Sequence, residues 1–156
     1  MTGTGVVSGS LRLDHVGISV PDLDAAITFF IDGFGAQVVF RMDRPAAPGP
    51  VGAHRLGAPA DAQFALAMLS LGDGRLELLQ WWAAAARGDL PPIESPGGSH
   101  VAVEVADVGE ALARLARLDG VAVLSQPLTF EHDPTPGLTN AFVRAPWGAL
   151  IELLSW

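Results

Sequence analysis

The stretch His15–Leu23, with the sequence HVGISVPDL, recurs as HVAVEVADV at His100–Val108. Both copies alternate apolar residues with other residues, which is the two-residue period of a half-buried β-strand. Each copy places an aspartate, Asp22 or Asp107, directly before its last residue. An aspartate there can accept hydrogen bonds from the first free N–H groups of a helix. The sequence therefore predicts a strand followed by a helix at two places in the chain.

Each predicted helix carries one apolar stripe at helical spacing, which predicts that one face packs on a sheet. Glycines follow both stripes and are expected to end the helices, at Gly33 and Gly35 in the first and at Gly120 in the second. The stripes consist of Leu23, Ala26, Ile27 and Phe30 in the first helix and of Val108, Ala111, Leu112 and Leu115 in the second.

A second internal match closes each half of the chain. The run LELLQW at 76–81 resembles IELLSW at 151–156, and a glycine-containing turn precedes each run, as in a β-hairpin. Further strands are predicted at 36–40 and 63–69 in the first half, and at 121–125 and 140–144 in the second. Each half is therefore a strand, a helix and three strands. The predicted fold class is α+β, with two tandem βαβββ modules in one domain.

The predicted boundaries follow from glycine and proline. The modules are assigned to 11–82 and 99–156, and the proline-rich stretch 83–98 is the connector between them. A long loop is expected within 41–62, where proline and glycine crowd together. Residues 1–10, rich in Gly, Ser and Thr, are expected to form a flexible tail.

Composition restricts partners and chemistry. The net charge of -8 argues against nucleic acid and anionic membranes as partners, and no segment resembles a signal peptide or membrane span. We therefore expect a cytoplasmic protein that acts on a small molecule. The chain has no Cys, Lys or Tyr, which excludes thiolate, Schiff-base and phenolic chemistry. Proton transfer is left mainly to histidines and carboxylates.

Four residues recur in matching pairs: His15 with His100, and Glu77 with Glu152. In each opening strand the histidine lies on the face opposite the valines and isoleucines, where the helix should not cover it. The glutamates interrupt apolar runs, and a half-buried carboxylate is costly unless it is paired or binds a metal. Any one of the four taken alone is better explained as a structural residue. Their repetition in both halves predicts one shared site if a pseudo-twofold axis relates the modules.

Two imidazoles and two carboxylates suit one divalent metal ion, such as Ni, Co, Zn, Mn or Fe. This quartet, His15, Glu77, His100 and Glu152, leaves coordination positions open for water or substrate.

These motifs resemble the vicinal oxygen chelate superfamily, which includes glyoxalase I, extradiol dioxygenases and bleomycin-resistance proteins. The markers are the paired H-V-x-[IV]-x-V-x-D openings and the closing Gly-x-Leu-Ile-Glu-Leu strand, and the likeness spans Leu11 to Trp156. The His, Glu, His, Glu order is most similar to bacterial glyoxalase I. The resemblance implies a curved mixed-sheet cup, a homodimer, and a metal site within one chain or shared by two.

The activity that the resemblance implies is that of a metal-dependent lyase, isomerase or epimerase. The metal would bind two adjacent substrate oxygens and stabilise an enediolate, with Glu152 or Glu77 as the base. Ring cleavage by a dioxygenase is disfavoured because Tyr is absent and Glu77 adds a fourth ligand. Glu131 and His132 are expected to act as an outer acid or base, or simply to form a solvated turn.

Two other functions remain open on the same scaffold. One is a bleomycin-resistance-like protein that binds an antibiotic or metabolite without catalysis, and the other is a biosynthetic enzyme for a natural product. The turn Ala145–Ala149 departs from the superfamily's usual Asp-Pro-x-Gly-Asn, and its Trp147 would either shape a substrate pocket or cover the sheet edge. The arginines of the first long loop, Arg41, Arg44 and Arg55, would hold a small anion or remain solvated.

Overall fold

The first module has the predicted order of elements. The structure is a computed structural model that describes residues 12–45, 53–83 and 88–156, so the expected tail at 1–10 lies outside the described residues. The elements of the first module are strand β1 (Val16–Ser19), helix α1 (Leu23–Phe34), strand β2 (Gln37–Met42), the short 3-10 helix η1 (Ala53–Leu56), and strands β3 (Gln63–Leu71) and β4 (Gly74–Trp82).

The second module repeats this order with one addition. Its elements are β5 (His100–Glu104), α2 (Val108–Leu115), β6 (Ala122–Val123), β7 (Leu128–Thr129), β8 (Thr139–Arg144) and β9 (Leu150–Ser155). The strand predicted at 121–125 is present in shortened form as β6, and β7 is an additional strand; the two pair with opposite ends of β8. Periodicity could not show this, because both pieces are short and lie at the edge of their sheet.

Both helices begin at the predicted aspartates. The Asp22 carboxylate accepts a hydrogen bond from the Ala25 N–H at 2.9 Å, and Asp107 accepts one from Glu110 at 2.7 Å. Helix α1 ends at Gly35, whose φ of 68° lies in the left-handed region that glycine tolerates. The prediction that α2 runs to Gly120 was wrong. Helix α2 ends at Leu115, and the chain continues in tight turns through Leu118.

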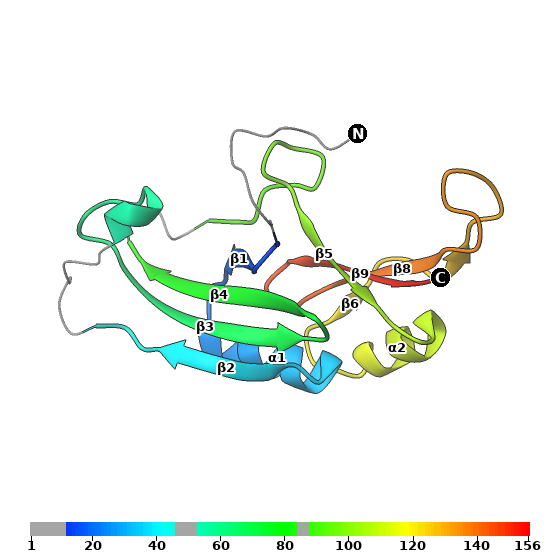
Figure 1. Cartoon of the computed structure of the whole chain (residues 1–156), viewed down its shortest axis with the longest axis horizontal. Helices are drawn as coiled ribbons and strands as arrows, with labels where there is room; N and C mark the ends of the chain where they lie inside the picture. The colour runs from blue at the N-terminus through cyan, green and yellow to red at the C-terminus, as the bar shows by residue number, and fades with distance from the viewer. Residues whose placement is uncertain (1–11, 46–52, 84–87) are drawn as a thin grey trace.

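The strands form two mixed sheets, one in each module. The first sheet has the order β1-β4-β3-β2, and the path of the second is β5-β9-β8-β6. Figure 1 shows the two sheets side by side, with α1 and α2 along the lower side of the molecule. The opening strand of each module pairs in parallel with its closing strand, β1 with β4 and β5 with β9. In each module this pairing places the repeated opening segment, which begins with a histidine, beside the repeated closing segment, which contains a glutamate.

A single apolar core joins the two modules. Buried residues of α1 and α2 and of the central strands of both sheets belong to one continuous cluster. Trp147, in the turn between β8 and β9, meets Phe29 of α1 edge to face, with ring centroids 5.2 Å apart. The helices also approach closely, because a Cβ added to Gly33 would lie 2.8 Å from the Leu115 side chain. The modules are thus packed as one domain.

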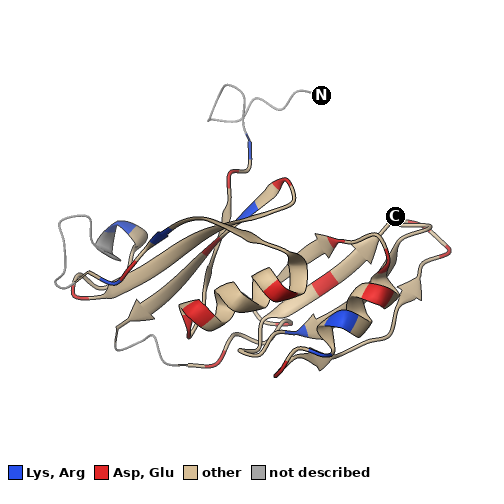
Figure 2. Ribbon diagram, turned by 90° about the horizontal axis from the view of Figure 1, so that it is seen from below, with Lys and Arg blue, Asp and Glu red and all other residues tan. Residues whose placement is uncertain are grey.

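Acidic and basic residues are spread over both modules (Figure 2), and none of those that the structure describes is buried. Several arginines are paired: Arg41 with Asp24 and Asp43, and Arg114 with Glu110 one helical turn away. Within the described ranges, neither helix has the length and hydropathy needed to cross a membrane.

Candidate metal centre

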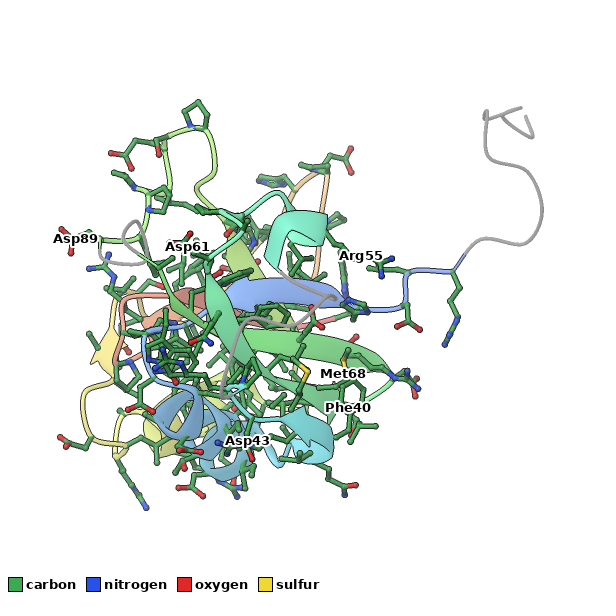
Figure 3. The ribbon with its side chains drawn as sticks, turned by 90° about the vertical axis from the view of Figure 1, so that its left-hand side faces the viewer. Phe40, Asp43, Arg55, Asp61, Met68 and Asp89 are labelled. Carbon is green, nitrogen blue, oxygen red and sulfur yellow. The ribbon has the colours of Figure 1, made fainter. Side chains whose placement is uncertain are left out.

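The candidate ligands lie on the face of each sheet that is turned away from its helix, which we call the open face. In the first sheet the register places Gly17 of β1 and Met68 of β3 beside Glu77. Phe40 of β2 lies next to Met68 on the same face (Figure 3). In the second sheet Ala102 of β5 and Phe142 of β8 lie beside Glu152. The two open faces therefore present equivalent glutamates from β4 and β9.

The first pair is formed by His15, directly before β1, and Glu77. Their Nε2 and Oε2 atoms are 3.7 Å apart, and the side chains are 37% and 20% exposed. Asp14, which the sequence analysis did not single out, lies 2.9 Å from Nδ1 of His15. With a proton on Nδ1 donated to this carboxylate, Nε2 is the nitrogen left free to bind a metal. The hydrogen bond with His15, supported by the charges of Arg75 and Arg12, keeps the pKa of Asp14 below its usual value.

The second pair is formed by His100, the first residue of β5, and Glu152. Nε2 of His100 lies 3.2 Å from Oε2 of Glu152, and the side chains are 43% and 13% exposed. The amide of Asn140 donates a hydrogen bond of 2.8 Å to the other oxygen of Glu152, Oε1. The sequence analysis did not single out Asn140. It belongs to a predicted strand and alternates onto the same face as Phe142, and this was the only signal in the sequence that it could lie near Glu152.

Each pair has the spacing expected of two ligands on one metal ion. Imidazole nitrogens and carboxylate oxygens bind such ions at about 2.0–2.2 Å, which puts neighbouring ligand atoms roughly 3 to 4 Å apart. The distances of 3.2 and 3.7 Å fall in this range. The donor types are also those of Ni, Co, Zn, Mn and Fe sites. The residues present therefore fit a divalent metal, with half of the ligand set in each module.

In the described part of the chain the two pairs do not form one cluster of ligands, although their histidines line the same cleft. Among the residues that the structure describes, no group of three or more His, Cys, Asp or Glu side chains is arranged to hold a metal ion. A cleft of about 300 Å³ at the junction of β1 and β5 is lined by both His15 and His100, but by neither glutamate. A larger cleft of about 890 Å³, between the end of α1 and α2, is lined by none of the four residues.

The other candidates lie apart from both pairs. Glu131 and His132 are exposed in the turn between β7 and β8, at the far right of Figure 1. Trp147 packs on Phe29 and Phe30 of α1, so it joins the modules and does not shape a pocket at either pair. Arg41 is held by two aspartates, and Arg44 lies over the Trp82 ring at 4.7 Å.

The chain also matches a known protein family over most of its length. The model of the Glyoxalase/Bleomycin resistance protein/Dioxygenase superfamily matches residues 12–153. The chain belongs to this superfamily. Membership confirms the resemblance drawn from the repeated strand openings and from the closing Glu152 strand.

Individual members of the superfamily that resemble this chain indicate its fold and its class of reaction more closely. The chain is 37% identical to a 2-epi-5-epi-valiolone epimerase from Actinomyces sp., over 99% of this chain and 84% of that protein. A glyoxalase family protein from Bacillus cereus is 25% identical, with a TM-score of 0.79 over 97% of this chain and 98% of that one. Glyoxalase I from Zea mays, 20% identical, has a TM-score of 0.66 over 92% of this chain and 44% of that chain. The structures confirm the glyoxalase-like α+β fold, and the named relative supports an enzyme of the isomerase or epimerase type.

Proposed function

We propose that this protein is a metal-dependent epimerase that inverts a carbon stereocentre next to a carbonyl group in a small polyoxygenated substrate. We further propose that two copies of the chain assemble each metal site. The relative named as an epimerase supports the reaction class. The two histidine–glutamate pairs support the metal and its divided site.

The observation that carries the proposal is the division of the quartet. Each module presents one imidazole and one carboxylate at metal-ligand spacing, yet no described group of three or more forms within one chain. A symmetric dimer can bring the first module of one copy against the second module of the other, and twofold symmetry then creates two equal sites. In such a dimer His15 and Glu77 would meet the partner subunit's His100 and the partner subunit's Glu152.

When bound, the metal would supply Lewis acidity toward two adjacent substrate oxygens. Of the chain's own residues, the histidines would hold the ion, and one glutamate would remove the proton from the carbon beside the carbonyl. The C–H electron pair moves toward the carbonyl carbon, and the carbonyl oxygen takes up the displaced pair. A proton then adds to the opposite face of the carbon, which inverts it. Open faces lined by Met68, Phe40 and Phe142 would exclude water around the reacting carbon.

The first test is direct. Purified protein is titrated with Co²⁺ after chelation, and its activity is assayed by NMR on 2-epi-5-epi-valiolone, the compound in the relative's name. We expect one ion per chain and conversion to an epimer that stops when the metal is removed. A metal-free protein that epimerises at full rate would contradict the metal role. A protein that binds an antibiotic tightly but no metal would favour the bleomycin-resistance-like function.

The second test addresses the shared site. His15→Ala and His100→Ala are each expected to be inactive alone, because every site in either homodimer lacks one imidazole. Mixing the two variants under subunit exchange should restore about a quarter of wild-type activity, since about half of the dimers are mixed and each has one intact site. No recovery, with mixed dimers demonstrated by mass spectrometry, would place all four ligands in one chain. A doubly substituted chain, mixed with either single variant, is the matched control and should recover nothing.

A further inference from the structure

The two glutamates of the proposed site occupy equivalent positions but have different neighbours. Glu77 lies opposite Met68 in the pairing of β3 with β4, and Glu152 lies opposite Phe142 in the pairing of β8 with β9. Two positions before Met68 and Phe142, each neighbouring strand presents its next residue on the same face. This residue is Leu66 in the first module and Asn140 in the second. These two residues also pair at equivalent points, with Leu79 and Leu154.

Asn140 holds Glu152 in one orientation. Its side-chain amide donates 2.8 Å to Oε1, and this leaves Oε2 facing His100 at 3.2 Å. Glu152 is also the least exposed member of the quartet, at 13%. A hydrogen bond to a carboxylate is charge-assisted and strong, so rotating Glu152 away from this position would sacrifice it.

Glu77 lacks an equivalent restraint. Leu66 cannot donate a hydrogen bond, and within the described part of the chain the polar side-chain atom recorded near Glu77 is Nε2 of His15, 3.7 Å away. The neighbouring position on β1 is Gly17, and a Cβ there would already lie 3.2 Å from Oε2 of Glu77. The absent side chain therefore leaves room into which this carboxylate can turn. In the second module the equivalent position is occupied by Ala102.

We propose that Asn140 is a positioning residue that would hold Glu152 in the orientation of a metal ligand, while Glu77 is the glutamate that takes the substrate proton. This inference rests on the proposed function. The proton passes from the substrate carbon to an oxygen of Glu77, the C–H electron pair moves toward the carbonyl carbon, and the carbonyl oxygen takes up the displaced pair. A solvent proton then adds to the opposite face of the carbon, and Glu77 returns its own proton to water. Atoms and charge balance over the cycle.

The test separates metal retention from proton transfer. Asn140→Leu gives the second module the residue of the first, and Asn140→Asp removes the donor with almost no change in shape. Arg144→Leu, on the same face of β8, is the matched control. Each chain is titrated with Co²⁺ against a competing chelator. Loss of an outer-shell hydrogen bond typically weakens metal binding about 10- to 100-fold, and we expect this for both Asn140 variants. The control should stay within about twofold of wild type.

Proton transfer is then measured at saturating Co²⁺, as deuterium incorporation into 2-epi-5-epi-valiolone in D₂O. Glu77→Gln should cut exchange by about 100-fold or more, the usual contribution of a general base, while Co²⁺ binding falls much less. Glu152→Gln should show the reverse, with weak Co²⁺ binding and exchange that recovers when the ion is supplied in excess. Circular dichroism of every variant checks the fold.

Two results would overturn the inference. One is unchanged Co²⁺ affinity in folded Asn140→Asp. The other is an exchange rate that Glu152→Gln abolishes at saturating Co²⁺ and that Glu77→Gln retains. Failure of the proposed metal role gives a different result, because the wild-type chain would then bind no Co²⁺. If the wild type binds Co²⁺ but does not act on this compound, the Asn140 variants still test the positioning role through affinity alone.

Discussion

The first and second modules contain equivalent histidine–glutamate pairs, but the two modules support different members of the pair. In the first module Asp14 holds Nδ1 of His15, while Glu77 has no comparable support from the residues that the structure describes. In the second module Asn140 holds Glu152, and the residue before His100 is Ser99. The two modules thus repeat the four candidate ligands but not the residues that support them. In a site assembled from both modules, one fixed histidine and one fixed carboxylate would suffice to orient the ion.

The modules also differ in their turns. The hairpin turn between β3 and β4 is short and exposed, with Asp73 at its centre. The turn between β8 and β9 carries Trp147, which reaches across to Phe29 of the other module. One turn faces solvent and the other belongs to the shared core. This asymmetry predicts where the domain is most sensitive to substitution.

The largest effect, on the free energy of unfolding, is expected at the contact between Trp147 and Phe29. Trp147→Ala should destabilise the protein by about 2–3 kcal/mol, somewhat less than for a fully buried tryptophan, because the ring loses its packing on α1. Asp73→Ala, in the corresponding turn, should change stability by less than about 0.5 kcal/mol. Urea unfolding followed by circular dichroism measures both. Equal effects at the two turns would mean that Trp147 does not join the modules.

A smaller effect, on metal affinity, is expected when the carboxylate that supports His15 is removed. Asp14→Ala should weaken Co²⁺ binding about 10-fold, because His15 loses the carboxylate that orients its ring. Ser99→Ala, at the same position relative to His100, should leave the affinity unchanged. Chelator competition gives both values. A loss at Ser99 as large as that at Asp14 would show that the modules support their histidines alike.

The smallest effect concerns the space beside Glu77. Gly17→Ala makes the first module resemble the second, where Ala102 occupies this position. The added methyl group would meet Oε2 of Glu77 at 3.2 Å, and since this is the flexible end of a side chain, we expect turnover to fall only about two- to fivefold. Stability should hold or rise slightly, because alanine restricts the unfolded chain more than glycine does. Turnover that stays at the wild-type rate would argue against movement of Glu77 in this direction.

Much of the fold could be predicted because its sequence signals occur in both halves of the chain. The repeated opening strands, the capping residues Asp22 and Asp107 and the closing strands are local signals, and each reappears in the structure. The prediction was weakest at the second module's edge, where β6 and β7 are two residues each. Such short strands exist because β8 offers free backbone groups for pairing, and periodicity cannot reveal a partner.

The supporting residues of the site could not be predicted in the same way. Asp14 adjoins His15 in sequence, but nothing local shows that its carboxylate turns toward the imidazole. Asn140 reaches Glu152 only because β8 and β9 pair in one register, and a shift of one residue would turn it to the other face. The same limit applied to Trp147, whose partner Phe29 is far away in the chain.

The sequence by itself determined the doubled βαβββ plan and the four candidate ligands, because strand alternation, helix caps and metal-binding residue types are properties of short segments. Only the tertiary structure decided how those ligands are grouped and supported. It separates them into two pairs at 3.7 and 3.2 Å and gives each pair a different supporting residue. Side-chain contacts between distant strands depend on sheet register and on the packing of the two modules, and neither is encoded in any one segment.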